Sequence, residues 1–506
     1  MKRALISVFH KNNIEKIAAV LKKSGWEIIS TGGTAAYLKK HHIAVTEVSE
    51  ITRFPEILDG RVKTLHPLIF GPVLAKKTPE HLRQLRELAA GKIDLVIINF
   101  YPFEEVLEKK TAALDKMLEN IDIGGPSLVR AAAKNFKDTL VLIDENDYAQ
   151  VMEAVAKNTT VPIDLRKKLA QKAFAYTSFY DSLIAEYLQL GYTAPPAFLT
   201  VGGRNVHALR YGENPHQAAF LVVRDRLSPF YAVEQLQGKE LSFNNILDAA
   251  MVYEALNDFQ DKKHFSIIVK HQNPCGAAQA PAQATAFQNA FAGDPRSAYG
   301  GIVGFNQRLE AETAAAISDI FFEVIVAPDF SAAALKILKK KKNLRLVKMP
   351  AGYVEKSDFK TIPGGFVYQG RDNRVANAAK FVLQCGSPLS QKEKHDAAFG
   401  WKLVKYVKSN GIIIVKNRQL IGVGAGQASR IDAVELAIGK SQLPIAGAML
   451  LSDAFFPFPD SIELAAKNKI AVVVETGGSV RDPEVIAAAR KLGVKLLFTG
   501  IRHFRH

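Results

Sequence analysis

The first part of the chain alternates between short continuous hydrophobic runs and hydrophobic residues at helical spacing. The continuous runs predict four strands, at Ala4–Phe9, Trp26–Thr31, Leu95–Asn99 and Thr139–Ile143. Helical spacing is seen between them, at Ile14, Ile17, Ala18 and Leu21 and again at Leu128, Ala131 and Ala132. Strands that alternate with amphipathic helices are typical of a parallel sheet covered by helices, so this region is predicted to be α/β.

A long helical stretch without glycine separates this region from the rest of the chain. It runs from Val161 to Leu190 and is followed by Gly191 and by the pair Pro195-Pro196, which are typical of a helix end and a linker. We therefore predict a first domain over residues 1–195 and a second domain over residues 196–506.

The pattern beyond about Thr200 predicts a second α/β region with strands at Phe265–Lys270, Ile412–Lys416 and Ala471–Glu475. Two predicted strands, Ser266–Lys270 and Gly411–Lys416, are each followed by a turn of small residues and a helical segment. This repeated order indicates two related halves.

Length and composition fit a multidomain cytoplasmic protein. The 506 residues exceed what one hydrophobic core organises, and 48% hydrophobic and 23% charged residues are ordinary for a globular chain. The apolar run Ala4–Phe9 is too short for a signal peptide, and no apolar stretch approaches a membrane span. The two cysteines, Cys275 and Cys385, are too few for a disulfide framework, so a reducing compartment is expected.

The net charge of +16 raises the alternative of a nucleic-acid-binding protein. The positive residues are spread along the whole chain, and the one dense run, Lys339–Lys342, follows a helical stretch and contains no aromatic residue. We interpret that run as a solvated helix end. We therefore expect basic clefts that bind small anionic molecules. We expect neither a nucleic acid nor a membrane as a partner.

Two glycine turns in the first region are candidate anion sites. The predicted strand at Trp26–Thr31 leads into Gly32-Gly33 and a helix start, where backbone N–H groups can approach a phosphate; the alternative is a tight turn with Thr34 as the N-cap. The turn at Gly124-Gly125 opens a helix that carries Arg130 and Lys134 four residues apart, on one face.

Two further segments add cations and a phenol. Residues 60–67 bring Arg61, Lys63 and His66 close together in the sequence, which indicates an anionic pocket. Tyr101 follows the predicted strand Leu95–Asn99, at the end of a parallel strand where ligands usually bind.

These motifs resemble a known family. The segments STGGT, GRVKTLHP, NFYPF and IDIGG followed by LVRAAAKN are similar, in this order, to the inosine monophosphate (IMP) cyclohydrolase half of the bifunctional purine-biosynthesis enzymes. The resemblance implies a methylglyoxal-synthase-like fold and ring closure of the formylated ribotide FAICAR by attack of its carboxamide nitrogen on its formyl carbon. It implies catalytic roles for Lys63, Tyr101, Asp122 and Lys134. The implied substrate-binding residues are Lys11, Ser30, Thr31, Gly33, Thr34, Arg61, Thr64, Asn99 and Gly124.

The chain also departs from that family. Phe9 and His10 stand where the family usually has serine and aspartate, and Phe70 stands where a histidine is usual. Phe9 removes a hydroxyl expected at the phosphate. An impaired cyclohydrolase half therefore stays an alternative. Methylglyoxal synthase shares the fold, which raises a regulatory ligand-binding module as a further alternative, but the complete set of Lys63, Tyr101, Asp122 and Lys134 argues against it.

The second region has its strongest signal at Lys270-His271, which we interpret as a strand end before a helix-opening turn. Histidine is a natural proton acceptor near neutral pH, and an ordinary strand-end histidine is the alternative. The segments 209–217, 242–245, 294–301, 424–430 and 453–458 resemble the transformylase half of the same enzymes, so the resemblance covers nearly the whole chain.

The transformylase resemblance implies two cytidine-deaminase-like subdomains in a homodimer whose sites are shared between subunits. It implies formyl transfer from 10-formyltetrahydrofolate to the ribotide AICAR, with His271 taking a proton from the attacking amine and Lys270 stabilising the oxyanion. The implied ribotide and folate residues are Arg210, Tyr211, Asn245, Glu323, Asn410, Arg430, Phe455, Pro457, Asp460, Arg502 and His506. A zinc site is not expected, because Cys275 lacks the second cysteine of the deaminase motif.

Overall fold

The computed structural model describes residues 1–58, 60–109, 113–189, 194–374 and 377–506, in two units. The first unit is Met1–Arg204 and the second is Asn205–His506. The predicted helix end at Gly191 lies outside the described residues. In the described part of the chain, no helix is both long and apolar enough to cross a bilayer.

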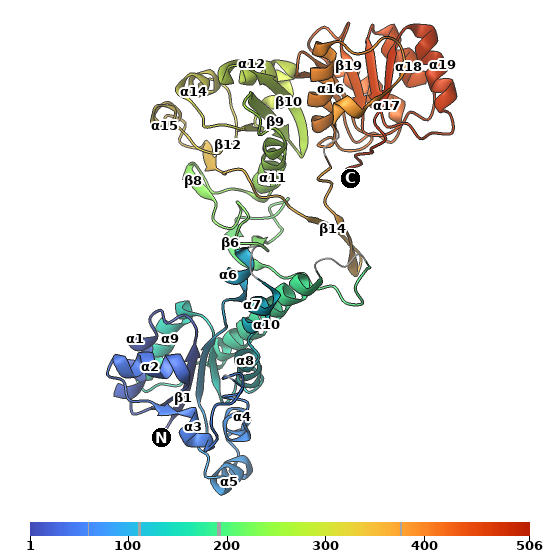
Figure 1. The fold of residues 1–506 in the computed structure, drawn as a ribbon. Helices are drawn as coiled ribbons and strands as arrows, with labels where there is room; N and C mark the ends of the chain where they lie inside the picture. Colours follow the sequence, from blue (N-terminus) through green and yellow to red (C-terminus); the bar gives the residue numbers. More distant parts are fainter. Residues whose placement is uncertain (59, 110–112, 190–193, 375–376) are drawn as a thin grey trace. The chain divides into compact units, whose positions relative to one another are not determined.

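The first unit is built on a five-stranded parallel sheet in the order β3-β2-β1-β4-β5 (Figure 1). Its strands are β1 Arg3–Val8, β2 Glu27–Ser30, β3 Thr46–Glu47, β4 Leu95–Asn99 and β5 Leu140–Leu142. The four predicted strands correspond to β1, β2, β4 and β5, while β3 is too short to produce a hydrophobic pattern.

Helices cover both faces of this sheet. They are α1 Ile14–Lys23, α2 Gly32–Lys40, α3 Val48–Thr52, α4 Pro67–Leu74, α5 Pro79–Glu87, α6 Phe103–Glu108, α7 Leu114–Glu119, α8 Gly124–Lys134, η1 Glu145–Asp147, α9 Tyr148–Ala156 and α10 Ile163–Gln189. Side chains alternate along the strands, so Leu5 and Val96 pack toward α8 and α10, while Ile6 and Ile97 pack toward α1 and α9. Burial on both faces explains why these strands are continuously apolar.

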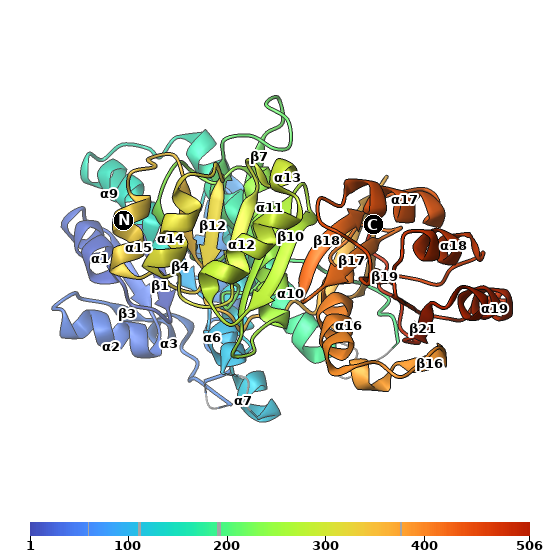
Figure 2. The same cartoon turned by 90° about the horizontal axis from the view of Figure 1, so that it is seen from above.

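The second unit contains a twelve-stranded sheet made of two halves that follow one another along the chain (Figure 2). The first half consists of β8 Glu234–Gln237, α11 Phe243–Asp258, β9 His264–Lys270, β10 Asn273–Ala280, α12 Gln283–Gly293, α13 Pro295–Ala298, β11 Ile302–Phe305, α14 Ala311–Ser318, β12 Val324–Ala327, α15 Ala332–Leu338 and β13 Arg345–Lys348. The second half consists of η2 Ala378–Lys380, β16 Val382–Cys385, α16 Gln391–Val404, β17 Ile412–Lys416, β18 Gln419–Gly424, α17 Arg430–Lys440, β19 Met449–Ser452, α18 Asp460–Lys467, β20 Val472–Glu475, α19 Asp482–Leu492 and β21 Lys495–Phe498.

The two halves have the same strand pairing. In the first, β9 is antiparallel to β10 and β11, and β11, β12 and β13 are parallel; in the second, β17 is antiparallel to β18 and β19, and β19, β20 and β21 are parallel. The halves join where β10 meets β18. Two hairpins stand outside this sheet, β6 Arg204–Leu209 with β7 Ala219–Val223, and β14 Ser357–Ile362 with β15 Gly365–Gly370. The predicted pair of related halves is therefore confirmed, and Lys339 lies at the end of α15, as the solvated-helix interpretation requires.

One local prediction is wrong. The turn after Lys270-His271 opens a second strand, β10, and not a helix, and Lys416 is likewise followed by β18. The physical reason is the turn itself, since two residues with positive φ between antiparallel strands form the tight hairpin that suits strand twist. The small residues of β10 carry no strand periodicity that the sequence could reveal.

Candidate active sites

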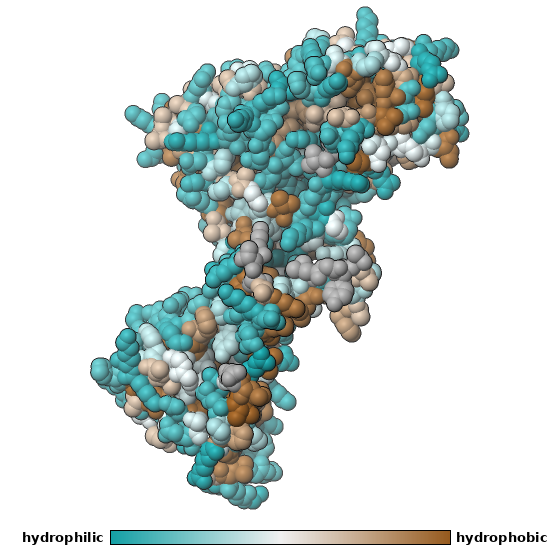
Figure 3. Space-filling model, viewed as in Figure 1, coloured by the Kyte–Doolittle hydropathy of each residue, from teal (hydrophilic) through white to brown (hydrophobic). Residues whose placement is uncertain are grey.

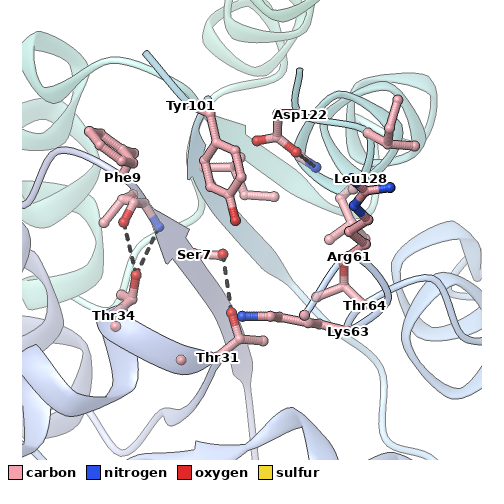
Figure 4. A pocket seen from close by; sticks show the side chains of 18 of the residues that line it. Ser7, Phe9, Thr31, Thr34, Arg61, Lys63, Thr64, Tyr101, Asp122 and Leu128 are labelled. Carbon is pink, nitrogen blue, oxygen red and sulfur yellow. Dashed lines mark hydrogen bonds between the residues drawn. The ribbon is translucent and has the colours of Figure 1, made fainter. Parts of the chain in front are cut away.

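The first unit contains a pocket of about 870 Å³ at the carboxyl ends of β1, β2 and β4 (Figure 4). Eleven of the predicted site residues line it: Lys11, Thr31, Gly33, Thr34, Arg61, Lys63, Thr64, Asn99, Tyr101, Asp122 and Gly124. Parallel strands present their carboxyl ends together, which is why segments far apart in the sequence converge here.

The turn after β2 forms one wall of this pocket. Helix α2 begins at Gly32, which has a φ of 43°, and its N-cap is Thr31 without a side-chain capping bond. The alternative N-cap, Thr34, is wrong, because its hydroxyl accepts from Val8 N at 3.1 Å and donates to Val8 O at 2.9 Å. The uncapped N-terminal turn of α2 therefore presents backbone N–H groups suited to an anion.

The loop after β1 is fastened beside this turn. Asn99 Oδ1 accepts from the backbone N–H groups of Phe9 at 2.5 Å and His10 at 3.1 Å, and Asn99 Nδ2 donates to His10 O at 2.9 Å. Lys11 Nζ donates to Phe9 O at 2.9 Å, and burial lowers the pKa of this ammonium. The side chain of Asn99 thus holds the loop that carries Lys11 through three hydrogen bonds to its backbone.

Lys63, Tyr101 and Asp122 form the group with acid–base capacity. Lys63 Nζ lies 3.1 Å from Glu56 Oε2, and the Tyr101 side chain extends into the pocket toward Ser7 (Figure 4). Asp122 Oδ1 accepts from Gly125 N at 2.8 Å. Burial raises the pKa of Asp122 above its ordinary value, so its carboxylate is a stronger proton acceptor than an exposed one.

Two predicted members of this site lie elsewhere. Ser30 is fully buried and its hydroxyl donates to Ile6 O at 2.6 Å, so it does not reach the pocket. Lys134 is the last residue of the eleven-residue helix α8 and does not line the pocket, although Gly124 and Leu128 of the same helix do.

Lys134 instead lines a separate hollow of about 640 Å³ together with Arg130, Phe70, Leu74 and Phe174. Leu74 and Phe174 are each 39% exposed, and hydrophobic side chains gather over α4 on the face seen in Figure 3. Phe70, which stands where the family usually has a histidine, therefore lines this hollow and not the pocket of Lys63.

Sequence reasoning missed the acidic partners in the first pocket. Glu56 pairs with Lys63, and Glu119 pairs with Arg61. Ser7 and Asp115 also line the pocket. No spacing rule links Glu119 with Arg61, although Ser7 could have been found, because it lies near the carboxyl end of β1, at the same sheet edge as Asn99.

The second unit has a smaller cavity of about 260 Å³, which Lys270 and His271 line together with Asn273 and Asp294. His271 is exposed, and Lys270 Nζ donates to Tyr299 O at 2.7 Å. Cys275 also lines the cavity, but burial raises the pKa of its thiol to about 12, which suits a packed thiol and not a nucleophile. Among the described residues, no three His, Cys, Asp or Glu side chains gather as metal ligands would.

The other predicted residues of this half contact protein groups outside that cavity. Asn245 belongs to the capping box of α11 and donates to Glu323 Oε2 at 3.2 Å, and the same oxygen lies 3.1 Å from Arg345 Nη1. Arg430 is buried and pairs with the fully buried Asp453.

The remaining ones are spread over several segments. Arg210 Nη2 donates to Tyr211 Oη at 2.6 Å, and Asn410 Nδ2 donates to Gln427 O at 2.9 Å. Phe455 and Pro457 precede α18, which begins at Asp460. In the C-terminal segment, Arg502 lies over the Phe504 ring and His506 O accepts from Lys360 Nζ at 2.7 Å. None of these residues lines the cavity of Lys270 and His271.

Comparison with known proteins gives consistent matches over the whole chain. The family model described as AICARFT/IMPCHase bienzyme matches residues 132–440, and the MGS-like domain matches residues 13–127. The chain is 45% identical to the bifunctional purine biosynthesis protein PurH of Caldicellulosiruptor saccharolyticus over 516 residues, covering 100% of both chains. PurH proteins of Persephonella marina and Thermoanaerobacter sp. are also 45% identical, with both chains covered completely.

Among solved structures, one described as the crystal structure of ForH covers 37% of this chain and 97% of its own, at 33% identity and a TM-score of 0.34.

Proposed function

Because the chain belongs to the AICARFT/IMPCHase family of bifunctional PurH proteins, we propose that its two units divide the two reactions of that family between them. The enzyme performs the two final steps of IMP synthesis, formylation of AICAR to FAICAR and cyclisation of FAICAR to IMP. We assign the cyclohydrolase to residues 1–195 and the transformylase to residues 196–506. The formyl donor of the family is a formyltetrahydrofolate, and we propose the 10-formyl isomer here.

The convergence of Lys63, Tyr101 and Asp122 on one pocket carries the cyclohydrolase assignment. The carboxamide nitrogen of FAICAR attacks the formyl carbon, an N–C bond forms, and the formyl oxygen leaves as water. Asp122 accepts the carboxamide proton, and Lys63 and Tyr101 stabilise the oxyanion and protonate the departing hydroxyl. The phosphate binds at the N-terminal turn of α2, near Lys11 and Thr31.

The transformylase assignment rests on Lys270 and His271, which line one cavity. The amine of AICAR attacks the formyl group of the folate, His271 takes the amine proton, and Lys270 stabilises the tetrahedral oxyanion. The C–N bond to the folate then breaks as the protonated His271 returns its proton to the folate nitrogen, which releases tetrahydrofolate and FAICAR. No metal is required in this scheme.

We also propose a homodimer. Lys134 does not line the pocket that it is expected to serve, and its hollow has an apolar floor rimmed by Arg130. Docking of a second copy on this hollow would bury the apolar side chains and bring Lys134 to a neighbouring pocket. A second copy would likewise complete the transformylase site, since the predicted ribotide and folate residues do not line the cavity of His271.

A cytoplasmic location fits the cysteine chemistry. Both cysteines, Cys275 and Cys385, are free thiols, and Cys385 is buried. Free thiols are typical of reducing compartments.

The test mixes purified enzyme with AICAR and 10-formyltetrahydrofolate and follows products by absorbance. The wild type makes IMP, His271→Ala consumes no folate, and Lys63→Ala accumulates FAICAR, because each change removes one unit's chemistry. Lys416→Ala is a matched control, since this lysine ends β17 as Lys270 ends β9 and lies outside both pockets. Folate consumption by His271→Ala would contradict the proposal.

The alternative of an impaired cyclohydrolase has one observation in its favour. Phe9, 44% exposed, lies edge-on to Tyr101 with ring centroids 5.9 Å apart, where the family has a hydroxyl. If wild type stops at FAICAR and Phe9→Ser restores IMP formation, this alternative replaces the first.

A further inference from the structure

The turn that presents His271 has a backbone that its residues do not favour. His271 has a φ of 54° and Gln272 a φ of 57°, so both occupy the left-handed region between β9 and β10. Tight hairpin turns with two such residues are dominated by asparagine, aspartate and glycine. Neither histidine nor glutamine adopts it as readily as glycine, so an external contact helps to hold this conformation.

Asp248 supplies that contact from the helix packed beneath the hairpin. Its side chain is only 8% exposed, Oδ2 accepts from His271 N at 3.0 Å, and Oδ1 accepts from Gln272 N at 2.6 Å. Hydrogen bonds to an ionised carboxylate are shorter and stronger than neutral ones. One carboxylate therefore fixes both backbone N–H groups of the turn.

The second half of the unit repeats this arrangement without a histidine. Asp396 accepts from Asn417 N at 3.0 Å and Arg418 N at 2.6 Å, and both turn residues have a φ of 56°. Asp248 follows its N-cap Ser242 by six residues, and Asp396 follows its N-cap Ser390 by the same number. The aspartate and the turn thus form one structural unit that occurs twice.

We propose that Asp248 is a positioning residue of the transformylase, which fixes the backbone of His271 and thereby aims its imidazole at the cavity shared with Lys270. The inference rests on the proposed role of His271. A glycine at position 271 would adopt the turn unaided but would carry no imidazole. The buried carboxylate allows a histidine to occupy that position.

The experiment compares Asp248→Asn with Asp396→Asn in the full chain. An asparagine keeps one acceptor but turns an amide donor toward the second N–H group, so both hairpins loosen alike. We expect transformylase kcat to fall about 10- to 100-fold in Asp248→Asn, as for a misplaced catalytic group, with KM for AICAR little changed. Asp396→Asn, matched in geometry, keeps its transformylase kcat within about threefold of wild type although its melting temperature falls similarly.

A rescue variant separates positioning from general damage. Glycine accepts positive φ without strain, so Gln272→Gly in the Asp248→Asn background restores part of the lost transformylase kcat. Cyclohydrolase activity, measured on FAICAR in the same preparations, stays at the wild-type rate in every variant. If Asp248→Asn is too unstable to purify, Asp248→Ser is compared with Asp396→Ser in its place, and equal transformylase kcat in these two variants overturns the proposal.

The outcomes also distinguish a failure of the positioning role of Asp248 from a failure of the catalytic role of His271. If His271→Ala retains formyl transfer, the role of His271 fails. If His271→Ala is inactive while Asp248→Asn and Asp396→Asn have equal transformylase kcat, the role of His271 stands and the positioning role of Asp248 is overturned.

Discussion

The carboxyl of Asp122 lies just before α8, largely withdrawn from water, and accepts a backbone N–H from Gly125. Burial raises its pKa, and the hydrogen bond only partly offsets that effect. Only the ionised form accepts a proton, so activity that depends on it falls as pH decreases through the raised pKa. We expect the acid limb of the cyclohydrolase kcat/KM profile to lie above the pH at which an exposed aspartate titrates.

The pH–rate profile of FAICAR cyclisation checks this prediction. Asp122→Asn should lower kcat about 100-fold or more and abolish the acid limb. Asp115→Asn is the control, because this carboxyl lines the same pocket without an assigned role and should leave the limb in place. A limb that persists in Asp122→Asn would assign the proton transfer to another group.

Among single residues, the three catalytic candidates in loops were predicted better than Ser30, which lies within β2, and Lys134, which lies within α8. Lys63, Tyr101 and Asp122 do line one pocket, since strand ends and glycine turns converge at one sheet edge. Ser30 and Lys134 do not, because a side chain's facing direction and the length of a helix are not visible in a motif. Their proposed roles stay predictions.

Among the elements, close contact between the hairpins and their helices restricts two glycines. A Cβ on Gly276 of β10 would lie 2.1 Å from Ala290 O of α12, and a Cβ on Gly422 of β18 would lie 2.5 Å from Ala437 O of α17. We expect Gly276→Ala and Gly422→Ala each to destabilise the second unit by about 1–3 kcal/mol, because a backbone carbonyl cannot swing aside as a flexible side chain can.

Thermal melting of the full chain checks this expectation. Gly439→Ala provides the control, since Gly439 lies in α17 with no atom near its Cβ position, and alanine there should be neutral or stabilising. If Gly276→Ala and Gly422→Ala both keep the wild-type melting temperature, the hairpins can move away from their helices at little cost in folding free energy.

Elements were predictable where burial made them apolar. The strands β1, β4, β9 and β17 are nearly fully buried and appear as continuous hydrophobic runs. The strand β10 was missed because its alanines and glycine pack closely against α12 and carry little hydrophobic signal. Tertiary contact, and not local propensity, determines this strand.

For the whole molecule, the proposed homodimer predicts that each cyclohydrolase site combines Lys63 of one subunit with Lys134 of the other. We expect Lys63→Ala and Lys134→Ala to be inactive as cyclohydrolases when pure. Mixing and reassembling the two variants should restore activity, because one site of each mixed dimer then carries both lysines. The measurement is IMP formation from FAICAR before and after subunit exchange.

The control is a mixture of Lys63→Ala with Asp122→Asn, two residues of the same pocket. In a mixed dimer each pocket then lacks one of them, so no activity should return. Restoration in this control, or none in the Lys63 and Lys134 mixture, would contradict the shared-site dimer.

The two aspartate-held turns also bear on the ancestry of the second unit. Duplication of an ancestral half would copy the helix, its aspartate and its turn together, and this explains why Asn417 sits on a backbone that matches His271. Chemistry could then arise by one replacement at a position whose conformation was already secured. The turn at Asn417 has the same backbone without a histidine, so the conformation itself does not depend on a catalytic side chain.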